Sequence, residues 1–440
     1  MNTPVFDFLQ RYANSNTLRL HMPGHKGQAQ GPLASVLPYD ITEIHGADSL
    51  FDAEGILRES EENASHLFGS AATFYSAGGS TLCIQAMLTL ATRPGSTVVA
   101  ARNAHKAFLN TCVLLDLSVE WVFPQEGVLR DIVSFSYTPE DIEQAIYAAG
   151  NPSCVYITSP DYYGRMADVA AIAKVCRKHG LPLLVDNAHG AHLAFLEENL
   201  HPMALGADMC CDSAHKMLPV LTGGAYLHIQ NPRFIQGVKD AMALFGSTSP
   251  SYLILCSLDL CNRYLAEHAR NAIAQAAKGI ADLKACLSPR FEVVDSEPLR
   301  LTLHTAPSGI KGTEAAQFLR EQGIECEYAD HGHIVLLFSP VDSREDIETV
   351  KQAFLNIPTG FPIQGETFGL ERPTQVLSIR GASLAENETV PVEESVGRIC
   401  GKTRILCPPG IPVVAAGEKI GENCMNILKG YSILSVNVVK

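Results

Sequence analysis

Residues 209–216 read Met-Cys-Cys-Asp-Ser-Ala-His-Lys, and this stretch decides the fold class of the chain. Residues 209–211 form an apolar run typical of a buried strand, and a polar turn that ends in Lys216 follows at once. Burial lowers the pKa of a lysine, and the neutral amine can then form a Schiff base with a carbonyl compound. The alternative is a surface lysine, because most lysines in proteins are unperturbed.

A second polar stretch follows another apolar run about thirty residues earlier. Residues 183–185 read Leu-Leu-Val, and residues 186–192 read Asp-Asn-Ala-His-Gly-Ala-His. Ligands of open α/β sheets bind at the carboxyl ends of the strands. Asp186 at such an end can pair with a protonated pyridine nitrogen and keep that ring an electron sink. The alternative is an aspartate that caps a helix or a turn.

Residues 76–81 read Ser-Ala-Gly-Gly-Ser-Thr and lie between a predicted strand over 73–75 and a predicted helix over 82–91. Gly79 lets a phosphate approach the backbone, and Ser80 and Thr81 add hydroxyl donors at the positive end of the helix dipole. The turn is neither a Walker motif nor G-x-G-x-x-G, so it is a weak signal when taken alone.

His105 follows a predicted strand over 97–101. A flat imidazole at that place can stack on a planar cofactor, and a surface histidine is the alternative. Taken together, a phosphate cradle, a ring partner, a stacking group and an imine-forming lysine at strand ends of one sheet are what pyridoxal phosphate (PLP) requires.

Short apolar runs alternate with helical periods through most of the first 230 residues. The further strands are predicted over 154–158 and 224–229, and strands without polar alternation that are joined by helices indicate an α/β fold with a mostly parallel sheet. Residues 1–40 are predicted to be irregular, because 21–27 is rich in turn formers.

The pattern changes after residue 262, where a predicted helix over 263–287 leads into a smaller α+β domain. Its strands are predicted over 291–294, 300–304 and 333–338, and its helices over 313–322 and 344–354. We therefore predict an N-terminal segment (1–45), a large PLP-binding domain (46–262), a small α+β domain (263–365) and a C-terminal element (366–440).

Composition limits the partners of the chain. The 440 residues carry a formal net charge of −14, which disfavours nucleic acid as a partner. The charge favours a cationic small molecule, and the alternative is that it serves only solubility. The 13 cysteines include no C-x-x-C pair, so we expect reduced thiols and neither a metal site nor structural disulfides. The chain shows no signal peptide or membrane-spanning run, and we expect a cytoplasmic protein without a membrane partner.

With these motifs in place, the chain resembles the ornithine/lysine/arginine decarboxylase family, which has the aminotransferase-like PLP fold (fold type I). It looks closest to the shorter bacterial members that lack an N-terminal wing domain. The segments that carry the resemblance are 21–27, 40–43, 46–48, 101–106, 186–192, 213–219, 247–252 and 408–412.

The resemblance implies a role for each motif. It makes Lys216 the imine-forming lysine, Asp186 the partner of the pyridinium, His105 the stacking residue and His189 a neighbour of the ring hydroxyl. It implies phosphate contacts from the polar residues Ser80, Thr81, Ser213 and His215. In this fold the site lies at a dimer interface, so the resemblance also implies a homodimer in which the 247–251 loop serves the partner subunit.

The implied reaction is decarboxylation of arginine, lysine or ornithine to an amine for polyamine metabolism. His215 or Lys216 supplies the proton to Cα, and the candidate acceptors for the distal cation of the substrate are acidic residues: Glu43, Asp48, Asp52, Glu54 and Glu418. Transamination on the same fold and a catalytically silent relative are the alternatives. Retention of Lys216, Asp186 and His105 argues against a silent relative.

The chain departs from the family pattern in three places. Asn187 stands where a glutamate is expected, Cys407 stands where an aromatic residue is expected, and residues 415–418 match only loosely. These departures concern substrate choice and rate, because the implied cofactor residues are all retained.

Overall fold

The computed structural model describes residues 1–28, 31–123, 128–129, 133–134, 136–364, 368–369, 372–405 and 410–440. The chain forms two compact units. Unit 1 consists of Met1–Leu90 and Leu184–Ala274, and unit 2 consists of Ala91–Leu183 and Gln275–Lys440. The domain boundaries expected from the sequence stay a prediction.

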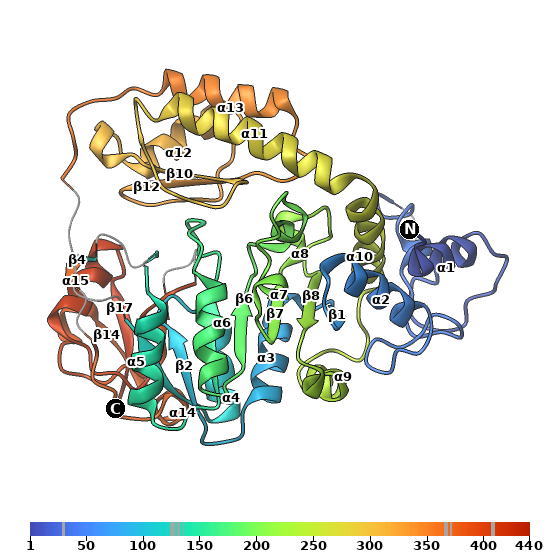
Figure 1. Ribbon diagram of the computed structural model, residues 1–440, viewed down its shortest axis with the longest axis horizontal. Helices are drawn as coiled ribbons and strands as arrows, with labels where there is room; N and C mark the ends of the chain where they lie inside the picture. The colour runs from blue at the N-terminus through green and yellow to red at the C-terminus, as the bar shows by residue number, and fades with distance from the viewer. Residues whose placement is uncertain are drawn as a thin grey trace. The chain divides into compact units, whose positions relative to one another are not determined.

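The strands of unit 1 lie in the order β1-β8-β7-β6. Their bounds are Ala72–Ser76 (β1), Leu183–Asp186 (β6), Met209–Asp212 (β7) and Ala225–Ile229 (β8). β8 runs antiparallel to both of its neighbours, whereas β6 and β7 are parallel, with Asp186 opposite Cys211. The carboxyl ends of β6 and β7 therefore meet at the same edge of the sheet, where ligands of such folds bind (Figure 1).

The helices of unit 1 include the segment that contains Lys216. Their bounds are α1 (Pro4–Ala13), η1 (Leu37–Tyr39), α2 (Ile56–Phe68), α3 (Gly79–Ala91), η2 (Ala191–Phe195), α7 (Pro202–Leu205), α8 (Ala214–Met217), η3 (Pro232–Gly237), α9 (Val238–Ala243), α10 (Tyr252–Tyr264) and η4 (Leu265–Ala269). α11 (Arg270–Leu287) begins in unit 1 and continues into unit 2.

Helix α1 corrects the prediction that residues 1–40 are irregular. Pro4 begins the helix, where its missing N–H has no helical partner to lose, and Val5 and Leu9 bury their side chains on one face. The helix has no side-chain cap from its own neighbours. Asp259 in α10 accepts the N–H of Val5 at 3.0 Å instead. Because the cap comes from a residue so distant in the chain, the local sequence gives no sign of it.

The strands of unit 2 form one parallel set and several antiparallel sets. β5 (Cys154–Thr158), β2 (Thr97–Ala101) and β3 (Ser118–Val122) are parallel and lie in that order. A four-stranded antiparallel sheet has the order β11-β12-β10-β9, and β13-β4, β14-β17 and β15-β16 are two-stranded. The bounds of these strands are β4 (Val128–Leu129), β9 (Glu292–Val293), β10 (Arg300–His304), β11 (Tyr328–Ala329), β12 (His333–Leu337), β13 (Phe368–Gly369), β14 (Asn387–Pro391), β15 (Arg404–Ile405), β16 (Pro412–Val414) and β17 (Ser435–Val439).

The helices of unit 2 start at local capping signals in several cases. Thr138 and Asp141 form a capping box at α5, as do Ser343 and Asp346 at α13. The bounds are α4 (Lys106–Leu115), α5 (Pro139–Ala149), α6 (Val169–Lys178), η5 (Ala306–Ser308), α12 (Gly312–Glu321), α13 (Arg344–Asn356), α14 (Ile379–Leu384), η6 (Val392–Glu394) and α15 (Glu422–Gly430).

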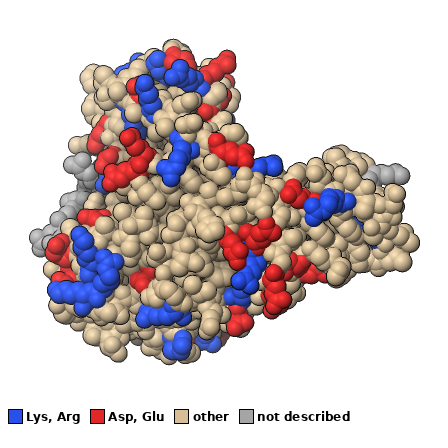
Figure 2. Space-filling view, turned by 45° about the vertical axis from the view of Figure 1, so that its right-hand side comes forward, with Lys and Arg blue, Asp and Glu red and all other residues tan. Residues whose placement is uncertain are grey.

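Charged side chains of both signs are scattered over the face in Figure 2, most of which consists of other residues. In Figure 2, acidic groups lie next to Lys and Arg groups, so the face in view is not uniformly acidic despite the net charge of −14. None of the helices in the described part of the chain combines the length and the apolar character that crossing a bilayer requires.

Candidate active site

Lys216 lies in α8, which directly follows β7, and its side chain is half-buried. Its Nζ is 3.0 Å from Nε2 of His189. His189 follows the parallel neighbour β6 and is buried. The structure therefore brings these two predicted site residues together at the carboxyl edge of the sheet.

Asp186 is the last residue of β6 and is 2% exposed. Its Oδ1 accepts the N–H of Ala188 at 3.2 Å and the S–H of Cys211 at 3.7 Å. Burial and the nearby charge of Asp186 raise the pKa of the Cys211 thiol well above its usual range. Cys211 thus stays a neutral donor to the Asp186 carboxylate.

The first residue of α3 is an open backbone position. Gly79 has a φ of +66°, and no atom lies within 4 Å of where a Cβ would stand. The hydroxyl of Ser76 accepts the N–H of Gly78 at 3.1 Å and donates to the carbonyl of Gly79 at 2.9 Å. This arrangement holds the turn so that the N-terminus of α3, with the exposed Thr81, stays accessible to an anion.

Ser213 and His215 come from the segment after β7. The hydroxyl of Ser213 donates to Oγ of Ser80 at 2.7 Å, which places two predicted phosphate contacts together at the N-terminus of α3. Nδ1 of His215 donates to the carbonyl of Gly224 at 3.0 Å, and the imidazole is thereby oriented.

His105 belongs to unit 2, whereas the other predicted site residues belong to unit 1. It is the N-cap of α4, and its Nδ1 accepts the N–H of Ala107 at 3.1 Å. Gly410, with a φ of +85°, packs so closely that a Cβ there would lie 2.8 Å from two ring atoms of His105. The imidazole is thus held by its own helix and by the backbone of Gly410.

Two of the acidic candidates for the distal cation of the substrate already have structural partners. The carboxylate of Asp48 accepts backbone N–H groups from Ser49, Glu54, Gly55 and Leu57. Glu418 is 1% exposed and pairs with both terminal nitrogens of Arg102 at 2.6 and 2.8 Å. The remaining candidates are exposed: Glu43, Asp52 and Glu54.

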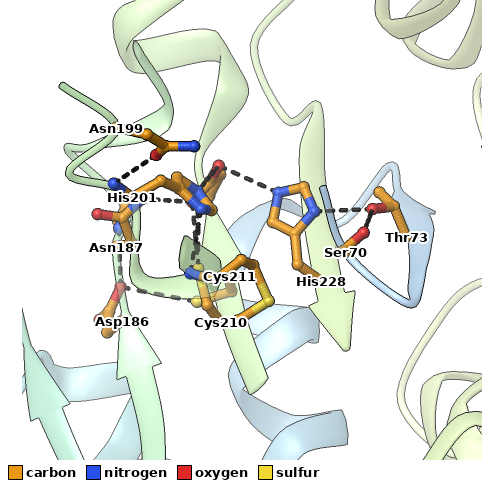
Figure 3. A network of polar contacts seen from close by, with 12 residues as sticks. Ser70, Thr73, Asp186, Asn187, Asn199, His201, Cys210, Cys211 and His228 are labelled. Atoms are coloured by element: carbon orange, nitrogen blue, oxygen red, sulfur yellow. Dashed lines mark hydrogen bonds and ion pairs between the residues drawn. The ribbon is translucent and has the colours of Figure 1, made fainter. Parts of the chain in front are cut away.

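The structure adds residues that were not among the predicted site residues. Asp212, the last residue of β7, accepts hydrogen bonds from His201, His228 and Asn187. Figure 3 shows His201, His228 and Asn187 in this network beside Asp186. An aspartate at the end of an apolar run is the one local signal for Asp212, and the two histidines have no signal in the sequence.

The chain matches the Orn/Lys/Arg decarboxylase major domain over residues 3–296 and the C-terminal domain of the same family over residues 377–434. The chain belongs to this family. Because the family consists of amino-acid decarboxylases, the protein is an amino-acid decarboxylase.

Relatives match over nearly the whole chain. The arginine decarboxylase of Halalkalibacterium halodurans is 30% identical over 452 residues, which cover 96% of this chain and 91% of that protein. The arginine decarboxylase of Bacillus subtilis is 28% identical over 450 residues, with the same coverage of 96% and 91%.

Solved structures confirm the predicted fold. The lysine decarboxylase of Francisella novicida superposes with a TM-score of 0.82 at 18% identity and covers 100% of this chain and 81% of its own. A serine palmitoyltransferase of Sphingomonas wittichii superposes with a TM-score of 0.57 at 15% identity and covers 70% of this chain and 78% of its own. The chain therefore has the aminotransferase-like fold (fold type I), with a mostly parallel sheet and a smaller α+β part.

Proposed function

We propose that the protein is a PLP-dependent decarboxylase of a basic amino acid, with arginine as the first substrate to test. The observation that carries the proposal is the meeting of Lys216, His189 and Asp186 at the carboxyl ends of two parallel strands. Family membership supports the reaction, and arginine decarboxylases among the relatives, at 28–30% identity, support the substrate.

The residues at this edge fit PLP. The space at Gly79 and the N-terminus of α3 suit a phosphate, for which Ser80, Thr81, Ser213 and His215 are the further donors. The carboxylate of Asp186 suits a pyridinium nitrogen, and the amine of Lys216 suits the carbonyl of the cofactor. We also propose His105 as the group that stacks on the ring.

When bound, PLP supplies an electron sink for the negative charge that remains on Cα after CO₂ leaves. Asp186 keeps the ring nitrogen protonated in this scheme. His189 exchanges a proton with Nζ of Lys216, to which it is already hydrogen-bonded at 3.0 Å. His215 or Lys216 then delivers the proton to Cα, and the product is the amine of the substrate, a precursor for polyamine synthesis.

The distal cation of the substrate needs an acidic partner that is still available. Asp48 and Glu418 have structural partners, so the exposed carboxylates Glu43, Asp52 and Glu54 are the remaining candidates. A guanidinium favours bidentate pairing with one of them. We also propose a homodimer, as the resemblance to the family implies.

The test is to purify the protein with PLP, record its visible spectrum, and follow CO₂ and amine release from arginine, lysine and ornithine in turn. We expect release from arginine, and loss of both the activity and the visible imine band in Lys216→Ala. Production of a keto acid without CO₂ would refute decarboxylation and favour transamination. Sedimentation velocity of the same sample tests the homodimer.

A further inference from the structure

Asp212 is the centre of a buried polar network at the ends of β6 and β7. Figure 3 labels its partners Asn187, His201 and His228. Its Oδ2 accepts Nε2–H of His201 at 3.0 Å and of His228 at 3.1 Å, and its Oδ1 accepts Nδ2–H of Asn187 at 2.7 Å. All four side chains are fully buried. A carboxylate without contact to water is stable only when hydrogen-bond donors surround it, and the side chains of His201, His228 and Asn187 are these donors.

The remaining ring nitrogens also have partners. Nδ1 of His201 accepts the N–H of Met203 at 3.4 Å, and Nδ1 of His228 is 2.8 Å from Oγ1 of Thr73. Nε2 of each ring is the donor to Asp212, because a carboxylate only accepts. Burial lowers the pKa of His228 and favours its neutral form. The two imidazoles hold the pKa of Asp212 below its usual range, so this carboxylate carries a negative charge.

Cys210 adds a further donor to Asp212. Side-chain atoms of His201, Cys210 and Asp212 lie within 4.8 Å of one another. Burial and the charge of Asp212 raise the pKa of the Cys210 thiol well above its usual range, so the thiol keeps its proton. Its S–H donates to Oδ1 of Asp212 at 3.6 Å.

The Asn187–Asp212 hydrogen bond joins the two strand ends that carry the site. Asn187 directly follows Asp186, and Asp212 directly precedes Ser213. The backbone N–H of Asn187 also donates to the carbonyl of Cys211 at 2.9 Å. A shift at this junction would therefore move the residues on both strand ends.

Gly190 shows that the turn is built around the amide of Asn187. A Cβ at residue 190 would lie 2.0 Å from Oδ1 of Asn187, so only glycine leaves room for it. The N–H of Gly190 donates to the carbonyl of Asn187 at 2.8 Å, which closes the turn.

We propose that Asn187 and Asp212 are positioning residues that hold the ends of β6 and β7 together, and so set Asp186, His189 and Lys216 in the geometry the reaction needs. This inference rests on the proposed function. It also explains why an amide stands at residue 187, where the resemblance leads one to expect a glutamate. A carboxylate at that place would face the charge of Asp212.

The decisive test exchanges the two groups in the PLP-loaded enzyme. In Asn187→Asp two carboxylates face each other, and we expect kcat to fall about 10²-fold at pH 8, the scale of loss that a small misplacement produces. Part of the activity should return toward pH 6, where the pair shares a proton. In Asn187→Asp/Asp212→Asn the donor and acceptor are exchanged, and kcat should return to within about 10-fold of wild type at both pH values.

Asp259→Asn is the matched control, because Asp259 is an equally buried aspartate of unit 1 that touches none of these residues in the described contacts. It should leave kcat and its pH profile unchanged. Wild-type kcat and pH profile in Asn187→Asp, or an exchange variant no more active than Asn187→Asp, would overturn the proposal.

A second measurement needs neither a variant nor activity. Nitrogen-15 NMR of the histidine side chains should show His228 protonated on Nε2 alone from pH 6 to pH 8, because burial lowers its pKa. A charged His228 imidazole, a proton on its Nδ1, or a stoichiometric metal ion in the purified protein would overturn the network. If the wild-type enzyme releases no CO₂ from any basic amino acid, the proposed function fails. In that case the NMR result and the visible imine band of the exchange variant still test whether Asn187 and Asp212 hold the ends of β6 and β7 together.

Discussion

Two carboxylates of unit 1, Asp212 and Asp259, are both fully buried, yet their pKa values shift in opposite directions. Burial favours the protonated form of Asp212, but the two imidazoles hold its pKa below the usual range. Asp259 accepts a hydrogen bond from Ser60 and two backbone N–H groups of α1, and burial raises its pKa to about 6.

The difference shows that the donors around a buried carboxylate decide its charge, while burial alone does not. Asp259 serves as the cap of a helix at the N-terminus and lies within two hydrogen bonds of Tyr75 and Asn262 through Ser60. Asp212 stands at the strand end that leads to Lys216. The network that keeps a permanent charge is the one next to the candidate active site.

The largest effect should come from Asp212→Ala. The three buried donors from His201, His228 and Asn187 lose their acceptor, and we expect the free energy of unfolding to fall by about 3–5 kcal/mol. Asp259→Ala should cost less, about 1–3 kcal/mol, because one of its donors, the N–H of Phe6, is only partly buried. Urea unfolding monitored by circular dichroism measures both. An equal or larger loss in Asp259→Ala would break the comparison.

The next effect is a difference in pH dependence. The folded state binds the proton of Asp259 more tightly than the unfolded state does, because burial raises the pKa of this carboxyl from 3.8 to about 6. The stability from this group is therefore complete below pH 4 and is lost as the pH rises through about 6. Over that window the free energy of unfolding of wild type, relative to Asp259→Asn, should fall by about 2–3 kcal/mol.

The contribution of Asp212 to the free energy of unfolding changes with pH in the opposite direction. Its pKa is lowered in the folded state, so its contribution is present above pH 4 and is lost as the pH falls further.

Urea unfolding of wild type and Asp259→Asn at pH 4, 5, 6 and 7 tests the predicted loss of stability from Asp259 as the pH rises. A constant difference between the two proteins would contradict it.

A smaller effect is expected from Gly190→Ala. The added methyl group would overlap the amide of Asn187 and force it off Asp212, at a cost of about 1–3 kcal/mol in the free energy of unfolding. Gly24→Ala is the control, because no atom lies within 4 Å of a Cβ there. If both variants unfold at the same urea concentration, the turn is not built around the amide.

The smallest effect should come from Thr73→Val, at the far end of the Asp212 network. The hydroxyl of Thr73 is 2.8 Å from Nδ1 of His228, and its loss should lower the free energy of unfolding by about 1 kcal/mol. The nitrogen-15 signal of Nδ1 in His228 should shift, while that of His201 stays in place. A shift at both histidines would mean that Thr73 acts on the whole network.

Much of the fold could be predicted from the sequence, because the signals are local. The strands predicted over 97–101, 154–158 and 300–304 are β2, β5 and β10, and β6 and β7 each bury all four of their residues. The predicted helix over 263–287 is more complicated, since it consists of the end of α10, the π-helical segment η4 and α11. Periodicity alone does not separate these segments.

The sequence by itself determined where two buried strands end, since Asp186 is the last residue of β6 and Lys216 lies in the segment after β7, and both strands are apolar runs. Tertiary structure alone decided what surrounds them. Pairing of β6 with β7 brings Asn187 to Asp212, 25 residues apart, and pairing of β7 with β8 brings His228 opposite Cys210. Likewise, α1 is capped by a residue more than 250 positions away. Contacts of this kind depend on strand order and packing, which no local pattern of residues records.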